Sequence, residues 1–305
     1  MPKLLWTQRQ DLGPAGRSGC AMAFDPVRGK TVLFGGSNPD RGTWEWDGQY
    51  WTQVSDMGPT LRREFGMTWD NASQRVMLFG GTAVIADPGI NDDPNKPVPL
   101  GDTWEWDGES WTQVDDAGPS ARFAYAIASD TTRNRVVLFG GANLMLGGLR
   151  ALGDTWEWDG TAWTQQDETG PFARSGHLMT FDSVRARTVL FGGVPIDGNG
   201  QSDTWEWSGA AWVRVSEFGP ASRFGAGFCF DGSQSILFGG QNFQSTLFRD
   251  TWSWDGRFWT QRQDIGPPPR SRHAMAFDTT RKKLVLFGGS GTDDASLNDT
   301  WELAT

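Results

Sequence analysis

A short pattern recurs six times along the chain, and this recurrence limits the possible folds more than any other feature. Each copy of Leu-Phe-Gly-Gly is followed by Thr-Trp, most often within Asp-Thr-Trp-Glu-Trp-Asp-Gly. A further tryptophan opens the next segment, and successive copies of it lie 45 to 60 residues apart. The glycine doublets end at Gly36, Gly81, Gly141, Gly193, Gly240 and Gly289. A period of about 50 residues indicates a repeat architecture with one structural unit per copy.

Each repeat contains four segments that have the pattern of β-strands. In the first repeat they are residues 17–24, 31–36, 43–47 and 51–54, which we name a, b, c and d. The dipeptide Asp47-Gly48 between c and d is typical of a tight hairpin turn. No segment has a convincing helical period. Six units of four strands predict an all-β fold: a six-bladed β-propeller with four antiparallel strands per blade.

The repeats also resemble a known family. The Gly-Gly doublet after an apolar strand, the tryptophan downstream and the arginine that opens the next strand are similar to Kelch repeats, and the similarity covers the whole chain. It implies a six-bladed propeller like the central domain of galactose oxidase. Kelch propellers include adaptors, cytoskeletal proteins, oxidases and sugar epimerases, so the resemblance implies the fold without choosing a function.

The order of segments at the two ends predicts how the ring closes. The chain opens with a d pattern around Trp6 and ends with a c pattern at Trp301. Residues 3–9 should therefore complete the last blade beside residues 300–303 and cover its edge. This predicts a single propeller domain over residues 1–305. Its blades are expected at about residues 16–54, 61–114, 121–166, 173–215, 222–262 and 269–303 plus 3–9.

Charge and composition exclude several classes of protein. The 305 residues include 27 Lys and Arg against 37 Asp and Glu, a net charge of −10, which argues against nucleic acid or anionic membranes as partners. No apolar run has membrane-spanning or secretory length, so we expect a soluble, cytoplasmic monomer unless a leader has been removed. The two cysteines, Cys20 and Cys229, lie on non-adjacent blades, which predicts free thiols.

One face of the predicted propeller is the candidate functional face. The a–b and c–d turns are short and uniform, whereas the b–c connections differ in length and composition. The b–c and d–a connections emerge on the same face, and variable loops on a rigid scaffold tend to carry function. The b–c connections are residues 37–41, 82–101, 142–153, 194–202, 241–249 and 290–298.

Segment a begins with arginine in every repeat. In five repeats an aspartate stands just before Thr-Trp on the same face, where it can form a bidentate pair with that arginine. The first repeat has Gly42 there, so we expect Arg17 to be the unpaired guanidinium, suited to a carboxylate or phosphate ligand. Internal pairing and ligand binding are both open for the ring Arg17, Arg62, Arg122, Arg174, Arg223 and Arg270.

Departures from the repeat next to these arginines are candidates for chemistry. Two positions after the arginine, Glu64 and Arg272 replace small residues, and Arg63 adds a charge beside them. Three positions after it the chain has Cys20, Phe65, Tyr125, His177, Ala226 and His273. Packing is one interpretation of this ring, and acid–base use of Glu64, Tyr125 or a histidine is another. Because the histidines are two blades apart, we predict neither a metal site nor a cofactor.

Two b–c connections have features that favour a ligand site. Residues 82–101 contain Pro88, Pro94, Pro97 and Pro99, which predict a stiff wall or lid; Asp87, Asp92 and Asp93 match no calcium loop. Residues 142–153 and 241–249 are rich in leucine and phenylalanine, which either pack on each other or form a contact surface.

The tryptophans are interpreted mainly as core. The pair Trp44 and Trp46 recurs in four other blades, and a feature present in nearly every blade indicates packing between blades. Trp69 falls outside this rule, since it replaces a phenylalanine at the end of segment a.

Three functions remain open on the sequence. A binding propeller would hold an anionic or amphipathic small molecule or peptide at the arginine-lined channel mouth, with Tyr125 beside it. A metal-independent enzyme, such as an isomerase, epimerase or cyclase, would use the same pocket. A lectin would have several shallow, equivalent sites. We favour the binding propeller, because no nucleophile–base arrangement, phosphate loop or metal motif is visible.

Overall fold

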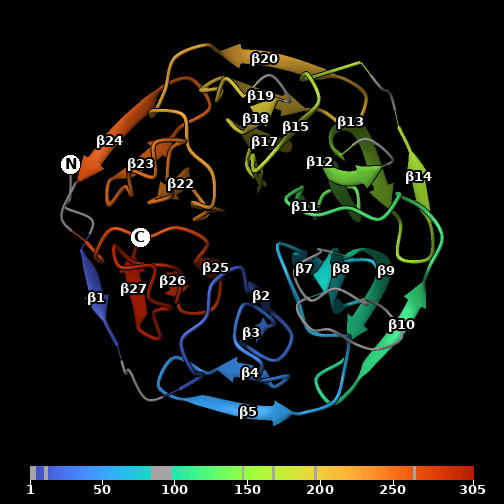
Figure 1. The fold of residues 1–305 in the computed structure, drawn as a ribbon, viewed down its shortest axis with the longest axis vertical. Helices are drawn as coiled ribbons and strands as arrows, with labels where there is room; N and C mark the ends of the chain where they lie inside the picture. Colours follow the sequence, from blue (N-terminus) through green and yellow to red (C-terminus); the bar gives the residue numbers. More distant parts are fainter. Residues whose placement is uncertain are drawn as a thin grey trace.

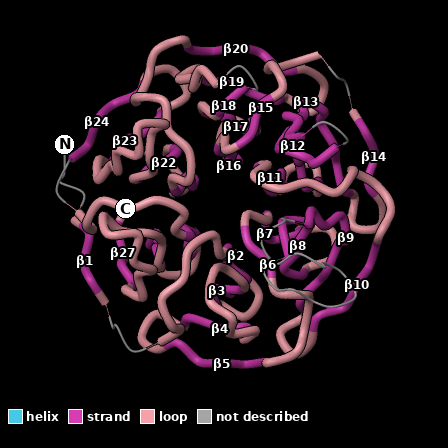
Figure 2. The backbone as a smooth tube through the Cα atoms, in the orientation of Figure 1, coloured by secondary structure: helices cyan, strands magenta, loops and turns pink. Residues whose placement is uncertain are grey.

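The structure is a computed structural model, and it describes residues 5–9, 13–83, 98–145, 148–166, 169–195, 198–263 and 266–305. These residues form strands and loops, with no helix among them (Figure 2). Small antiparallel sheets stand around a central axis (Figure 1). The fold is a six-bladed β-propeller, as the repeats predict. No helix in the described part of the chain could cross a membrane.

In each blade the first strand lies nearest the axis and the fourth lies on the rim (Figure 1). Blade 1 contains β2 (Ala21–Asp25), β3 (Lys30–Phe34), β4 (Thr43–Trp46) and β5 (Trp51–Ser55). Blade 2 contains β7 (Gly66–Asp70), β8 (Arg75–Ala83), β9 (Val98–Trp106) and β10 (Trp111–Asp115). Blade 3 contains β11 (Ala126–Asp130), β12 (Arg135–Met145), β13 (Gly148–Trp158) and β14 (Trp163–Gln165).

Blades 4 to 6 repeat this order with shorter central strands. Blade 4 contains β16 (Leu178–Asp182), β17 (Arg187–Phe191), β19 (Thr204–Trp207) and β20 (Trp212–Ser216). Blade 5 contains β21 (Gly227–Phe230), β22 (Ser235–Phe238), β23 (Thr251–Trp254) and β24 (Trp259–Gln263). Blade 6 contains β25 (Ala274–Asp278), β26 (Lys283–Phe287), β27 (Thr300–Ala304) and β1 (Trp6–Gln8). The short strands β6 (Arg62–Arg63), β15 (Arg174–Ser175) and β18 (Val194–Pro195) lie on the b–c side.

The last blade is completed by the start of the chain. β1 pairs antiparallel with β27, with Trp6 opposite Leu303 and Gln8 opposite Trp301. Trp6 Nε1 also donates to Thr251 Oγ1 of blade 5 at 3.2 Å. The predicted closure is therefore confirmed for the described residues of the N-terminal strand.

Tryptophans join each blade to the preceding one, as the packing interpretation predicts. Each rim-strand tryptophan donates its indole N–H to a threonine hydroxyl of the preceding blade at 2.8 to 3.2 Å. The pairs are Trp51–Thr300, Trp111–Thr43, Trp163–Thr103, Trp212–Thr155, Trp259–Thr204 and Trp6–Thr251. Since one such bond crosses every blade boundary, these tryptophans contribute to holding the ring together.

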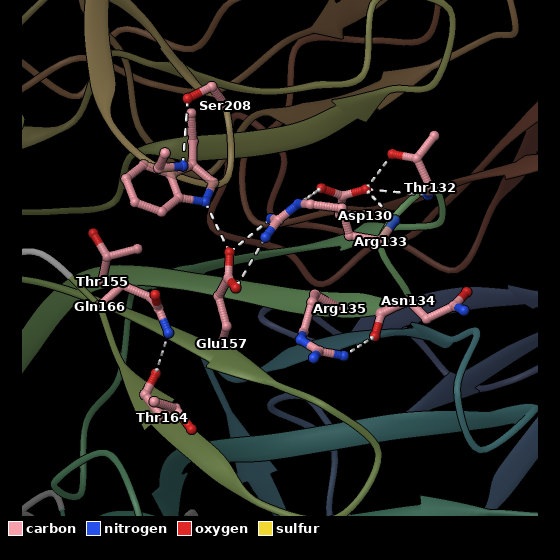
Figure 3. Close-up of polar contacts among 12 residues, drawn as sticks. Asp130, Thr132, Arg133, Asn134, Arg135, Thr155, Glu157, Thr164, Gln166 and Ser208 are labelled. Carbon is pink, nitrogen blue, oxygen red and sulfur yellow. Dashed lines mark hydrogen bonds and ion pairs between the residues drawn. The ribbon is translucent and has the colours of Figure 1, made fainter.

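A charged network at the a–b turns adds a second connection between blades. Arg133 Nε donates to Asp130 at 2.7 Å and its Nη2 donates to Glu157 at 2.6 Å (Figure 3). Glu157 also accepts the indole N–H of Trp207 from the next blade at 2.9 Å. Because the carboxylate is buried, the arginine and the indole satisfy it together.

In the two longest b–c connections the described residues pair as β-strands where the sequence predicts loops. β8 and β9 continue to pair after a β-bulge between Phe79 and Gly81, and β12 and β13 pair as far as Met145 opposite Gly148. Gly81 has a φ of 94°, a backbone conformation in which a side chain would be costly. The described part of residues 82–101 includes Pro99; Pro88, Pro94, Pro97 and the three aspartates lie outside the described residues.

Candidate functional site

The six arginines that open segment a are buried parts of the scaffold. Each donates to the carbonyl of the first glycine in its own doublet. Five of them pair with the predicted aspartate, at 2.6 to 2.8 Å: Arg62–Asp102, Arg122–Asp154, Arg174–Asp203, Arg223–Asp250 and Arg270–Asp299. Burial, the largest single influence, would raise the pKa of Asp102, but the hydrogen bond and charge of Arg62, together with the hydrogen bond from Trp104, lower that pKa overall.

The expectation that Arg17 is unpaired is wrong. Its Nη2 donates to Asp40 Oδ2 at 2.7 Å, and the side chain is fully buried. Asp40 also accepts the backbone N–H of Gly42 and the indole N–H of Trp44. It therefore replaces the aspartate that is missing at position 42. Asp40 lies two residues earlier in the connection, where alignment by position does not find it.

Two positions after each of these arginines lies a residue whose backbone is in the left-handed region, and the six such residues form a ring. It consists of Gly19, Glu64, Ala124, Gly176, Gly225 and Arg272, with φ between 51° and 69°. Backbone hydrogen bonds link members on neighbouring blades: Glu64 N donates to Gly19 O at 3.1 Å, and Gly19 N donates to Arg272 O at 2.8 Å. The ring fixes the backbone at the b–c and d–a end of the axis, which we call the mouth.

Glu64 and Arg272 bring opposite charges together over the mouth. Arg272 Nε lies 3.8 Å from Glu64 Oε1, although the residues belong to blades 6 and 2, with Gly19 of blade 1 between them. The Arg272 side chain is 46% exposed and that of Glu64 is 28% exposed, so both are accessible to a ligand. Arg63 is also exposed beside Glu64.

A cavity of about 430 Å³, which we call the mouth cavity, lies at this ring. Its wall combines all six left-handed residues with the six residues that follow them in segment a. Leu149 at the start of β13 and Phe243 in the blade 5 connection add apolar surface. The structure thus places Glu64, Arg272, Tyr125, His177 and His273 in the lining of one cavity, and the six buried arginines outside it.

Tyr125 is a fixed part of the blade 2–blade 3 boundary. Its hydroxyl donates to the carbonyl of Phe79 and accepts the N–H of Gly66. Burial raises the pKa of the phenol above its usual value. Both bonds to the backbone favour a packing role for this side chain over proton transfer.

The two histidines are buried and neutral in the mouth cavity. Burial, with a smaller effect from Arg174, lowers the pKa of His177 to about 3, and burial with Arg270 does the same for His273. His177 Nε2 lies 3.0 Å from the carbonyl of Phe139 and must carry the proton, which leaves Nδ1 as an acceptor. His177 Nδ1 and both ring nitrogens of His273 have no hydrogen-bond partner.

Cys20 lies in the same wall and is a free, buried thiol, as is the less buried Cys229. Burial raises the pKa of Cys20 to about 11, so the thiol is protonated at neutral pH. In the described ranges, no group of three or more His, Cys, Asp and Glu side chains is placed to hold a metal ion.

Comparison with known proteins supports the fold. No family model and no curated protein sequence matches the chain. The solved structure of YjhT is similar, with a TM-score of 0.77 over 94% of this chain and 95% of that chain. Their sequences are 12% identical. The likeness shows the fold alone. The resemblance to Kelch repeats stays a prediction.

Proposed function

We propose that this propeller is a binding protein that holds one anionic small molecule, or the acidic end of a peptide, in the mouth cavity. The observation that carries the proposal is the pair of Glu64 and Arg272. Both occupy left-handed positions, where three other blades have glycine and a side chain costs about 1–2 kcal/mol. Backbone strain of this kind clusters at ligand sites.

The proposed ligand has two parts. Its carboxylate or phosphate would bind Arg272, with Arg63 nearby, and would compete with Glu64 for the guanidinium. Its apolar part would pack against Leu149 and Phe243. The buried arginines from Arg17 to Arg270 already have aspartate partners, and we assign them to the scaffold.

An isomerase at the same cavity is the second candidate, and His177 is the observation that favours it. His177 lines the cavity, and its buried Nδ1, which has no partner, can accept a proton or a hydrogen bond from a substrate once the ring turns towards it. A pKa of about 3 makes this imidazole a weak base near neutral pH, so we rank the enzyme below the binding protein.

The test is calorimetry with a panel of N-acetylated amino acids and short dicarboxylates on three proteins. Arg272→Gly removes the charge and relaxes the backbone, and we expect it to weaken binding about tenfold or more. Gln74→Gly is the matched control, because Gln74 is also left-handed (φ 56°) but lies in an a–b turn away from the mouth. Unchanged affinity in Arg272→Gly, or several equivalent weak sites per chain, would overturn the proposal.

A further inference from the structure

A second cavity of about 560 Å³ lies on the same axis, towards the a–b turns, and we call it the turn-side cavity. Its wall is formed by the last three positions of segment a in all six blades. The deepest level is a ring of four methionines closed by Ile127 and Phe228; the methionines are Met22, Met67, Met179 and Met275. Unbranched, polarizable methionines adapt to an inserted apolar chain.

The level nearer the opening is formed by the last residue of segment a in each blade, and two blades depart from the common residue there. Four blades have phenylalanine there, whereas blade 2 has Trp69 and blade 3 has Ser129. Trp69 Nε1 and Ser129 Oγ are both buried without a hydrogen-bond partner. Every other tryptophan donates its indole N–H to a side-chain oxygen, as the inter-blade bonds of Trp46 and Trp51 illustrate. Both atoms have almost no exposed surface, so a ligand in the cavity reaches them only when these two side chains shift. A buried, unpaired indole N–H is costly, and an acceptor on a ligand would remove that cost.

One lysine supplies a positive charge at the opening. Of the described residues that line the turn-side cavity, Lys282 alone carries a charge. Lys30 and Lys283 form ion pairs, but among the described residues no carboxylate lies within ion-pair distance of Lys282. Asp278, at the end of the adjacent strand, accepts N–H groups of its own turn and does not line the cavity.

We propose that the turn-side cavity binds an unbranched aliphatic monocarboxylate. The carboxylate would accept the N–H of Trp69 and the hydroxyl of Ser129, within the field of Lys282, and the chain would extend to the methionine ring. From Met22 to Pro26 the lining spans four steps of extended chain, about 13 Å, which sets the depth for a medium-length chain. The volume is within the range of about 300–1,000 Å³ usual for small-molecule sites.

The experiment uses decanoate as the probe and 1-decanol as its uncharged analogue. Calorimetry should give one decanoate site per chain, with 1-decanol bound about tenfold more weakly or worse. In the ¹H–¹⁵N spectrum decanoate should shift the indole signal of Trp69, which is assigned by its absence in Trp69→Phe. That variant restores the residue found in four other blades, so the protein should fold, and affinity for decanoate should fall about tenfold.

Charge controls and a site control complete the test. Lys282→Gln should weaken binding several-fold, whereas Lys30→Gln, which removes an equal charge outside the cavity, should leave it unchanged. Arg272→Gly should also leave it unchanged, because Arg272 lines the mouth cavity. Absence of binding, equal affinity for 1-decanol, an unmoved Trp69 signal, or loss of binding in Arg272→Gly would each overturn the proposal.

Discussion

The indole N–H of Trp46 donates to Glu302 Oε1 at 3.2 Å and joins the first blade to the last. The same bond connects Trp106 to Glu45 and Trp207 to Glu157. Blade 6 has Leu303 in place of this tryptophan, and blade 5, which faces it, has Ser253 in place of the glutamate. The donor and the acceptor are thus absent together, because a buried glutamate without a partner is costly.

We therefore predict energetic coupling between Trp46 and Glu302. Trp46→Phe and Glu302→Gln should each destabilise the fold, and the double variant should be about 1 kcal/mol more stable than the sum of the two effects. Urea unfolding of the four proteins measures this coupling. Strict additivity would show that the bond contributes no stability beyond packing.

Asp40 should be as important to folding as the regular aspartates. Asp40→Ala leaves the Arg17 guanidinium buried and unpaired, so we expect a loss of about 3 kcal/mol in unfolding free energy. Asp250→Ala in blade 5 is the matched variant and should lose a similar amount. A much smaller effect of Asp40→Ala in thermal and urea unfolding would return Arg17 to the set of ligand-binding candidates.

The left-handed ring predicts substitutions that stabilise the protein. Glu64→Gly relieves the backbone at φ 57° and should raise the unfolding free energy by about 0.5–1 kcal/mol after the entropy of the unfolded chain is counted. Ala124→Gly, at φ 51°, should behave in the same way without removing a charge. If both variants are less stable than the parent, the ring is not strained at these positions.

His273 should make stability depend on pH. Its pKa is about 3 in the folded protein and about 6.5 in an unfolded chain, so between these values the unfolded state binds a proton that the folded state does not. Stability from this group is therefore lost as the pH falls from about 6.5 towards 3. His273→Phe, which copies Phe65 of blade 2, should reduce the fall in melting temperature between pH 7 and pH 4.

His177→Phe is the comparison for that experiment. It also removes the proton uptake, but it takes away the bond to the carbonyl of Phe139 and should lower stability at pH 7 by about 1 kcal/mol. Identical pH profiles for the parent and His273→Phe would contradict the neutral, buried state of His273.

Ring closure predicts a strong effect of Trp6. Its ring packs on Phe238 with centroids 5.1 Å apart, and it supplies the bond to Thr251. Trp6→Ala should cost about 2–3 kcal/mol, somewhat below a fully buried tryptophan. Thr7→Ala, on the exposed side of the same strand, should be nearly neutral in the same melting experiment.

The sequence by itself determined the repeat, the strands, the phase of the ring and the positions of five aspartates that are able to pair with arginines. These features depend on contacts within one blade or on a spacing that is the same in every copy, so a pattern of residues is enough to predict them. Arg62 and Asp102 are an example, since the same pair recurs at the same positions in four other blades.

Only the tertiary structure decided which irregular residues meet. Glu64 and Arg272 are more than 200 residues apart and come together because the closed ring places blades 6 and 2 on either side of blade 1. Asp40 bonds to Arg17 from two positions before Gly42, and the repeat pattern marks no partner there. The unpaired indole of Trp69 could be recognised only after every other indole N–H had been given its partner, and those partners lie mainly on neighbouring blades.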